Sequence, residues 1–198
     1  MASVTQQQVE EKIKEYIDPY LEKDLVSAKA VKDIKIAGDK VSVEIALGFP
    51  AKGYIPTLVS KLTEKIQQIP GVKGIEIKAT SKVVSHTVQK GVKMIPNVKN
   101  IIAVASGKGG VGKSTTAVNL ALALSAEGAT VGILDADIYG PSQPHMLGVH
   151  QQPESKDGRS LEPVMSYHLQ SMSIGYLIQD ETPMIWRGPM VTQALEQL

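Results

Sequence analysis

Apolar residues repeat at helical spacing in two segments of the first eighty residues. The first segment predicts a helix over residues 6–17, which ends before Pro19, and the second predicts a helix that begins at Pro56 and ends before Pro70. The apolar stripes are Val9, Ile13 and Ile17 in the first segment and Leu58, Leu62, Ile66 and Ile69 in the second.

Strand patterns lie around and after these helices. Val41, Val43, Ile45 and Leu47 alternate with smaller or polar residues, and a turn at residues 37–40 joins this run to an earlier one. We therefore predict a hairpin with one buried face, a loop before it at residues 20–30, and a third strand over residues 72–79. The order helix, strand, strand, helix, strand predicts a small α+β domain at residues 1–80.

The second half of the chain has a different pattern. Residues 101–105 predict a buried strand, residues 112–127 a helix, and residues 130–134 another strand, which together make a parallel unit. The helix is expected to bury Val118, Ala121, Leu122 and Ser125 or their neighbours. Residues 81–99 are expected to be a linker, and residues 100–198 the start of a second, α/β domain.

The rest of this half gives weaker signals. Proline, glutamine, glycine and serine are frequent up to Arg159, which predicts a mobile loop, and a strand is expected over residues 168–173. A final helix is predicted to open at Gly188-Pro189. A parallel sheet is rarely complete with about three strands, so we expect an incomplete sheet and a carboxyl-terminally truncated chain.

Composition narrows the function classes. The chain has 198 residues, with 42% hydrophobic and 21% charged residues, a net charge of +1 and no cysteine. These values predict a globular protein without disulfides or cysteine ligands, without a nucleic-acid-binding surface and without membrane association, in the cytoplasm. The four histidines show no metal-ligand spacing and are expected at the surface: His86, His145, His150 and His168.

The strongest chemical signal follows the strand predicted over residues 101–105. The letters GKGGVGKS fit G-x-x-x-x-G-K-[ST], the phosphate-binding loop of nucleoside triphosphatases. Backbone N–H groups of such a loop and the start of its helix surround phosphate oxygens, the lysine neutralises the β- and γ-phosphates, and the hydroxyl ligates Mg²⁺. The expected nucleotide-binding residues are Gly107, Lys108, Gly109, Gly110, Val111, Gly112, Lys113, Ser114 and Thr115.

The same letters also allow a dinucleotide site. Gly107, Gly109 and Gly112 spell G-x-G-x-x-G after a strand, and Asp135 lies about twenty residues further on, where a ribose-binding acid is expected. Lys113 and Ser114 favour the triphosphate, because a dinucleotide loop needs neither an ammonium nor a Mg²⁺-ligating hydroxyl there.

Two aspartates follow the strand predicted over residues 130–134. Ligands of parallel sheets bind at the carboxyl ends of the strands, so Asp135 and Asp137 are expected to face the phosphate loop. An alternative for either aspartate is that it only caps a loop.

The second half also resembles a known family. Lys108 in the phosphate loop resembles the extra lysine of the deviant Walker A loops of the MinD and ParA superfamily. More narrowly, residues 97–198 resemble the Mrp/ApbC family of iron-sulfur cluster carrier ATPases. This narrower resemblance rests on the letters LDADIYGPS at residues 134–142 and WRGPM at residues 186–190.

The resemblance implies roles that the spacing alone does not. It implies an Mg²⁺-dependent ATPase that works as a homodimer, in which Lys108 reaches the partner's nucleotide and Lys113 holds its own. It implies that Asp137 orients the attacking water, so that Lys108, Lys113 and Asp137 are catalytic. Ser114 would ligate Mg²⁺, with Asp135 supporting it through water. Arg187 could contact phosphate or a partner, or serve only a turn.

The first domain has its own resemblance. Residues 6–80 resemble the small PaaD-like domain of iron-sulfur assembly proteins through the groups at residues 18–19, 24–27, 31–34 and 70–72. That domain often carries a cysteine after its second strand, whereas residues 49–53 read FPAKG. Thiol chemistry by this domain is therefore in doubt.

These features lead to one main hypothesis and two alternatives. The main one is an ATP-hydrolysing carrier that assembles iron-sulfur clusters or transfers them to apoproteins, with an iron-sulfur scaffold or the client apoproteins as partners. The family's switch II aspartate and C-x-x-C motif follow the region seen here, so we expect this chain alone to bind no cluster and to be impaired as an ATPase. The alternatives are a MinD- or ParA-like positioning ATPase and a nicotinamide-dependent oxidoreductase.

Overall fold

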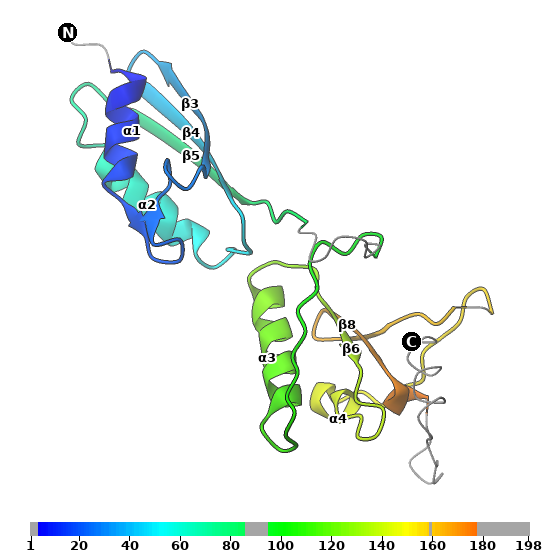
Figure 1. The fold of residues 1–198 in the computed structure, drawn as a ribbon. Helices are drawn as coiled ribbons and strands as arrows, with labels where there is room; N and C mark the ends of the chain where they lie inside the picture. Colours follow the sequence, from blue (N-terminus) through cyan, green and yellow to red (C-terminus); the bar gives the residue numbers. More distant parts are fainter. Residues whose placement is uncertain (1–3, 86–94, 159, 178–198) are drawn as a thin grey trace. The chain divides into compact units, whose positions relative to one another are not determined.

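A computed structural model describes residues 4–85, 95–158 and 160–177 of the chain. The chain divides into two compact units, Met1–Ile101 and Ile102–Leu198. We describe each unit by itself, with the element labels of Figure 1. No helix in the described ranges is both long and apolar enough to cross a membrane.

The first unit is a three-stranded sheet with two helices (Figure 1). Its sheet order is β3 (Val31–Ala37), β4 (Lys40–Leu47) and β5 (Gly74–Ser81). β3 and β4 form the predicted antiparallel hairpin, whereas β5 runs parallel to β4 because α2 (Ile55–Ile66) makes the crossover. Alternate residues of β4 enter the core, where they join the apolar stripes of α2 and of α1 (Gln6–Lys14). The predicted α+β arrangement is confirmed.

The end of the first helix differs from the prediction. The capping box of Thr5 and Gln8 forms and Val9 and Ile13 are buried, but α1 ends at Lys14. Ile17 is 60% exposed and belongs to a two-residue strand, β1 (Ile17–Asp18), which pairs with β2 (Lys23–Asp24). A residue before proline favours extended backbone, so Asp18 leaves the helical region before Pro19 is reached. The loop predicted at residues 20–30 therefore contains β2.

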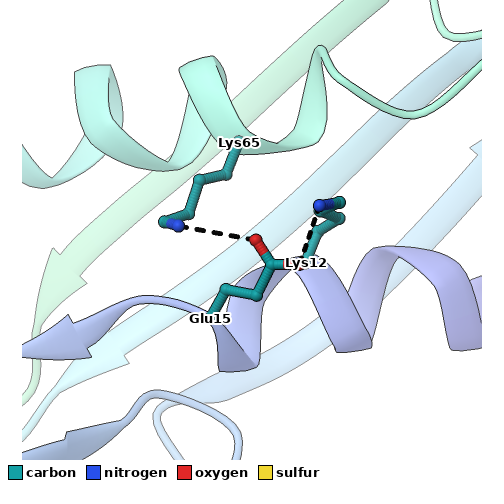
Figure 2. Close-up of polar contacts among 3 residues, drawn as sticks. All are labelled: Lys12, Glu15 and Lys65. Atoms are coloured by element: carbon teal, nitrogen blue, oxygen red, sulfur yellow. Dashed lines mark hydrogen bonds and ion pairs between the residues drawn. The ribbon is translucent and has the colours of Figure 1, made fainter.

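One charged group links the two helices of this unit. The Glu15 carboxylate lies 2.7 Å from Lys12 Nζ and 3.5 Å from Lys65 Nζ of α2, as Figure 2 shows. The hydrogen bond from Lys12 is the main reason that the pKa of Glu15 is lowered, and both lysine charges add to it. Because these side chains are partly exposed, the contact orients α1 on α2 more than it stabilises the unit.

The second unit has a mixed sheet in the order β6, β8, β7. β6 (Gly132–Asp135) runs parallel to β8 (Leu169–Ser173), and β7 (Val164–Ser166) runs antiparallel to β8. α3 (Lys113–Ala126) packs Val118 and Ala121 into a small core with Leu147 and Leu169. Of the other core positions predicted for this helix, Leu122 packs at the edge and Ser125 is half-buried. The α/β class is confirmed.

The strand predicted over residues 101–105 is absent. This segment forms no β-ladder, and Ile101 and Ile102 are 64% and 61% exposed. A strand needs a hydrogen-bonded neighbour, and a buried strand also needs a covering layer. Neither is supplied to this segment within the residues that the structure describes.

Two further elements were not predicted. α4 (Gln143–Leu147) lies within residues 143–159, where only a loop was expected, and it ends at Gly148. β7 precedes β8 in a tight hairpin whose two loop residues, Tyr167 and His168, have φ of 48° and 63°. Such turns usually contain Asn-Gly, so Tyr-His gives no hairpin signal in the sequence. The helix predicted from Gly188 lies outside the described residues.

Candidate nucleotide site

The phosphate loop leads directly into α3. Gly112 precedes the first helical residue, Lys113, and has φ of 86°, while Gly110 has φ of 72°. Side chains with a Cβ rarely adopt these angles, so glycine is needed at both positions for the loop to turn into the helix. Lys113 and Ser114 thus stand in the first turn of α3, where free backbone N–H groups and the helix dipole favour an anion.

The loop leaves Lys108 exposed, whereas Lys113 in the first turn of α3 is half-buried. The Lys108 backbone N–H donates to Ser106 Oγ at 3.2 Å, which holds the turn at the start of the loop. In residues 4–85, 95–158 and 160–177, neither Lys108 nor Lys113 forms an ion pair with an acidic side chain. Both ammonium groups are therefore available to an incoming anion.

Asp135 is the centre of a buried hydrogen-bond network at the end of β6. Only 7% of the residue is exposed. Its Oδ1 accepts from the Asp137 N–H at 3.1 Å, and its Oδ2 accepts from the N–H groups of Ser142 and Gln143 at 3.0 and 3.1 Å. The Ser173 hydroxyl also donates to Oδ2, at 3.2 Å. One carboxylate thus fixes both ends of the loop that carries Asp137.

The proline-rich part of this loop is held from a second side. A Cβ built on Gly175 would lie 3.0 Å from Pro144 Cγ and 3.2 Å from Pro141 Cβ, so the two prolines pack closely on the Gly175 backbone. The Gly175 N–H donates to Ser173 Oγ, which in turn donates to Asp135. The prolines and the hydroxyl therefore hold the loop in one position.

Gln143 connects this loop to the phosphate loop. It is 3% exposed, and its Nε2 donates to the backbone carbonyl of Ser114 at 3.4 Å, a long hydrogen bond. Its backbone N–H meanwhile donates to Asp135. Two buried atoms beside this junction, Gln143 Oε1 and Ser142 Oγ, have no hydrogen-bond partner within the described part of the chain.

Asp137 has a different environment from Asp135. It is exposed, and its Oδ1 accepts from the Gly140 N–H at 3.2 Å within the same loop. Over the described residues, no hydrogen bond or ion pair joins either lysine of the phosphate loop to either aspartate. The structure therefore joins Ser114 to Asp135 through Gln143 and leaves Asp137 free to meet water.

Sequence reasoning missed Gln143 and Ser173. The signal that could have found Gln143 is the group Ser142-Gln143-Pro144, because serine and an early proline are typical of a helix start. No local signal marks Ser173, which reaches Asp135 only because β8 pairs with β6.

The donor set at this junction suits a hard cation. The Ser114 hydroxyl and the carboxylates of Asp135 and Asp137 supply oxygen ligands. The buried Gln143 Oε1 and Ser142 Oγ are two further oxygens, and neither has a hydrogen-bond partner among the described residues. No cluster of three or more histidine or acidic residues able to hold a metal occurs among the described residues. Mg²⁺ fits such a site, since it is usually held by a few protein oxygens together with phosphates and water. The rings of His145 and His150 meet edge-on with their centroids 5.3 Å apart, and His86 and Arg187 lie outside the described residues.

Comparison with known families decides between the readings of the glycine-rich loop. Residues 97–198 match the family described as NUBPL iron-transfer P-loop NTPase. The chain belongs to this family. The match covers the phosphate loop, α3, β6 and the Asp135 loop, and it confirms the P-loop fold and the resemblance to iron-sulfur carrier ATPases. It speaks against the dinucleotide alternative.

The first unit matches a second family. Residues 6–78 match the family described as iron-sulfur cluster assembly protein, which confirms the resemblance to an assembly domain. Within this unit, Ala51 stands 1% exposed in the segment where such domains often carry a cysteine.

Individual relatives extend across both units. A protein named iron-sulfur cluster carrier protein from Escherichia coli K12 is 48% identical over 181 residues, covering 91% of this chain and 49% of the relative. A protein of the same name from Synechocystis is 43% identical over 184 residues, covering 91% and 52%. The chain thus spans about half the length of these relatives. A solved nucleotide-binding protein from Archaeoglobus fulgidus, in complex with ADP, is 47% identical over 37% of this chain and 31% of its own, with a TM-score of 0.35.

Proposed function

We propose that the full-length protein is an ATP-hydrolysing carrier that passes iron-sulfur clusters from a scaffold to client apoproteins. The observation that carries the proposal is the junction of the phosphate loop with the Asp135 loop, in which Gln143 contacts Ser114 and Asp135 holds the segment bearing Asp137. The family match and the names of the relatives favour a carrier over a positioning ATPase.

The residues of the phosphate loop bind the nucleotide in this proposal. The backbone N–H groups of residues 107–115 surround the phosphates, and Lys113 neutralises the β- and γ-phosphates. Ser114 would hold Mg²⁺, with Asp135 supporting it through water, and the bound cation would supply positive charge against the phosphate oxygens. Lys108 is exposed and reaches the nucleotide of the second copy in a homodimer.

Hydrolysis needs a positioned water molecule. Asp137 is exposed and its Oδ1 already accepts one backbone N–H, so its other oxygen can accept from the attacking water. Water attacks the γ-phosphorus while the bond from that phosphorus to the bridging oxygen breaks, giving ADP and phosphate. The charge of Lys108 and Lys113 stabilises this transition state more than the ground state.

Iron-sulfur clusters are the cargo, and their ligands are chiefly cysteine thiolates. This chain has no cysteine in either unit. We therefore expect no cluster on the 198-residue chain after anaerobic reconstitution, and a cluster on the full-length protein. Iron and acid-labile sulfide assays on both chains give the comparison.

The test of the function is a transfer assay. Full-length protein loaded with a cluster is mixed with a cysteine-ligated apoprotein, with and without Mg-ATP, and transfer is followed by absorbance and circular dichroism. Transfer that responds to Mg-ATP in wild type but not in Lys113→Ala is expected. A full-length protein that binds ATP but never holds a cluster would instead favour the positioning ATPase, and one that binds NAD but not ATP would overturn the P-loop assignment.

A further inference from the structure

We propose that Gln143 is a positioning residue that couples the Mg²⁺ side of the phosphate loop to the loop that carries Asp137. Three observations carry this inference. The side chain is almost fully buried, its amide donates to the Ser114 carbonyl, and its backbone N–H donates to Asp135. The inference rests on the proposed function, because it assigns a role in the same nucleotide site.

The contact with Ser114 restrains one side of the site. Ser114 is in the first turn of α3, so its carbonyl also belongs to the helix ladder, and the Gln143 amide uses the second lone pair of that oxygen. A restraint on the Ser114 backbone fixes where its hydroxyl lies. Gln143 therefore contributes to the placement of a magnesium ligand without touching the nucleotide itself.

The contact with Asp135 restrains the other side. Asp135 Oδ2 accepts from three donors and Oδ1 from one, so the carboxylate holds both ends of the loop and keeps one acceptor position on Oδ1. Asp137 lies two residues beyond Asp135 and takes its backbone position from this network. A shift of Gln143 is thus transmitted to Asp137 through one shared carboxylate.

The unpaired Oε1 of Gln143 indicates that a ligand binds next to it. A buried acceptor without a donor is destabilising, so such atoms normally have a partner in the working state of a protein. Ser142 Oγ, in the adjacent residue, is unpaired too among the described residues. Both atoms lie on the segment bound to Asp135, and the Gln143 amide nitrogen contacts the backbone of Ser114, the serine that would hold Mg²⁺. We assign Gln143 Oε1 as an acceptor for a water molecule of the magnesium shell.

The assignment predicts a magnesium-dependent defect. Outer partners of metal sites typically change metal affinity by about 10- to 100-fold when removed. In Gln143→Met, which keeps the side-chain length and removes both polar atoms, we expect the Mg²⁺ concentration for half-maximal ATP binding to rise about tenfold. ATP binding in the presence of a chelator should stay unchanged, because the phosphate contacts of the loop backbone and Lys113 are intact.

The experiment is an equilibrium titration on full-length protein. Binding of a fluorescent ATP analogue is measured against Mg²⁺ and in chelator for wild type, Gln143→Met and Gln170→Met. The last variant makes the same change at an exposed position of β8 and should match wild type. The melting temperature of each variant is measured in parallel, and Gln143→Asn, which withdraws the amide by one methylene, replaces Gln143→Met if the latter does not fold.

The outcomes separate this inference from the proposed function. A tenfold shift in the Mg²⁺ dependence at unchanged binding in chelator supports the positioning role. A lower melting temperature with an unchanged Mg²⁺ dependence shows that Gln143 only fills the core and overturns the inference alone. Failure of the wild type to bind Mg-ATP overturns the proposed function and this inference with it.

Discussion

Among the described residues, each unit buries one aspartate at the start of a loop, and the two aspartates have similar partners. Asp18 is fully buried, and its Oδ1 accepts from the Tyr20 and Leu21 N–H groups while its Oδ2 accepts from the Tyr54 hydroxyl at 2.7 Å. Asp135 also accepts backbone N–H groups from its own loop and one hydroxyl. In both cases a buried carboxylate replaces the water that loop backbone would otherwise need.

The surroundings of the two aspartates differ in what they connect. The partners of Asp18 all lie within the first unit, because the Tyr54 hydroxyl also bonds the Tyr16 hydroxyl at 2.8 Å and the Tyr54 ring meets the Tyr20 ring edge-on. Burial, more than these two bonds, raises the pKa of Tyr54, so the phenol stays protonated and remains a donor. The Asp135 network instead leads through Gln143 to the phosphate loop. The same arrangement therefore stabilises the fold in the first unit and leads to the candidate nucleotide site in the second.

The largest expected effect is a loss of nucleotide binding that occurs on substitution in the second unit and not in the first. Lys113→Ala removes the main cation opposite the β- and γ-phosphates, and we expect a loss of about 2–5 kcal/mol in Mg-ATP binding, roughly 30-fold to several thousandfold in Kd. Isothermal titration calorimetry measures this loss. Lys61→Ala, on the exposed face of α2, is the control and should bind Mg-ATP normally. Unchanged ATP affinity in Lys113→Ala would overturn the phosphate-loop assignment.

The next effect concerns rate more than binding. Lys108→Ala in the full-length protein should leave nucleotide binding by one subunit nearly intact and slow hydrolysis about tenfold to a thousandfold, as expected for a cation that acts on the transition state. Steady-state ATPase assays, with sedimentation velocity for the dimer, test this expectation. Normal hydrolysis with normal dimer formation would make Lys108 an ordinary loop residue.

The paired aspartates allow the comparison itself to be tested. Asp18→Ala leaves two loop N–H groups and a phenol without their acceptor, and we expect a loss of about 2–4 kcal/mol in unfolding free energy with normal Mg-ATP binding. Asp135→Ala should cost a similar amount and also weaken Mg-ATP binding about tenfold or more. Urea unfolding and Mg-ATP titration of both variants give the contrast. Equal nucleotide binding by the two variants would mean that Asp135 only holds its loop.

How far the sequence predicts this molecule depends on whether a signal is local. The stripe of α2, the alternation of β4 and the glycines around α3 each lie within one element, and the structure has all three elements. The strand expected over residues 101–105 does not form. A buried strand needs neighbouring strands, and the local pattern of apolar residues does not show whether such neighbours are present. In the site, the loop residues could be named from spacing alone. Ser173 could not, because it reaches Asp135 across 38 residues through strand pairing.

The smallest expected effect is a pH dependence confined to the first unit. Hydrogen bonding from Lys12, with the charges of Lys12 and Lys65, lowers the pKa of Glu15 below its ordinary value of 4.5, so the folded state holds this proton less tightly than the unfolded state does. The stabilisation is therefore present above the unfolded pKa and is lost as the pH falls through the lowered folded pKa. The melting temperature of wild type should be slightly higher than that of Glu15→Gln at about pH 7, and this gap in melting temperature should close by about pH 3. Glu64→Gln, whose carboxylate pairs with Lys61 at 3.6 Å and accepts from the Ser60 hydroxyl at 3.5 Å, is the matched control and should show a smaller gap. Because the contacts in Figure 2 are partly exposed, the gap should also shrink in high salt, and a gap that persists at low pH and high salt would show that Glu15 acts through packing instead of charge.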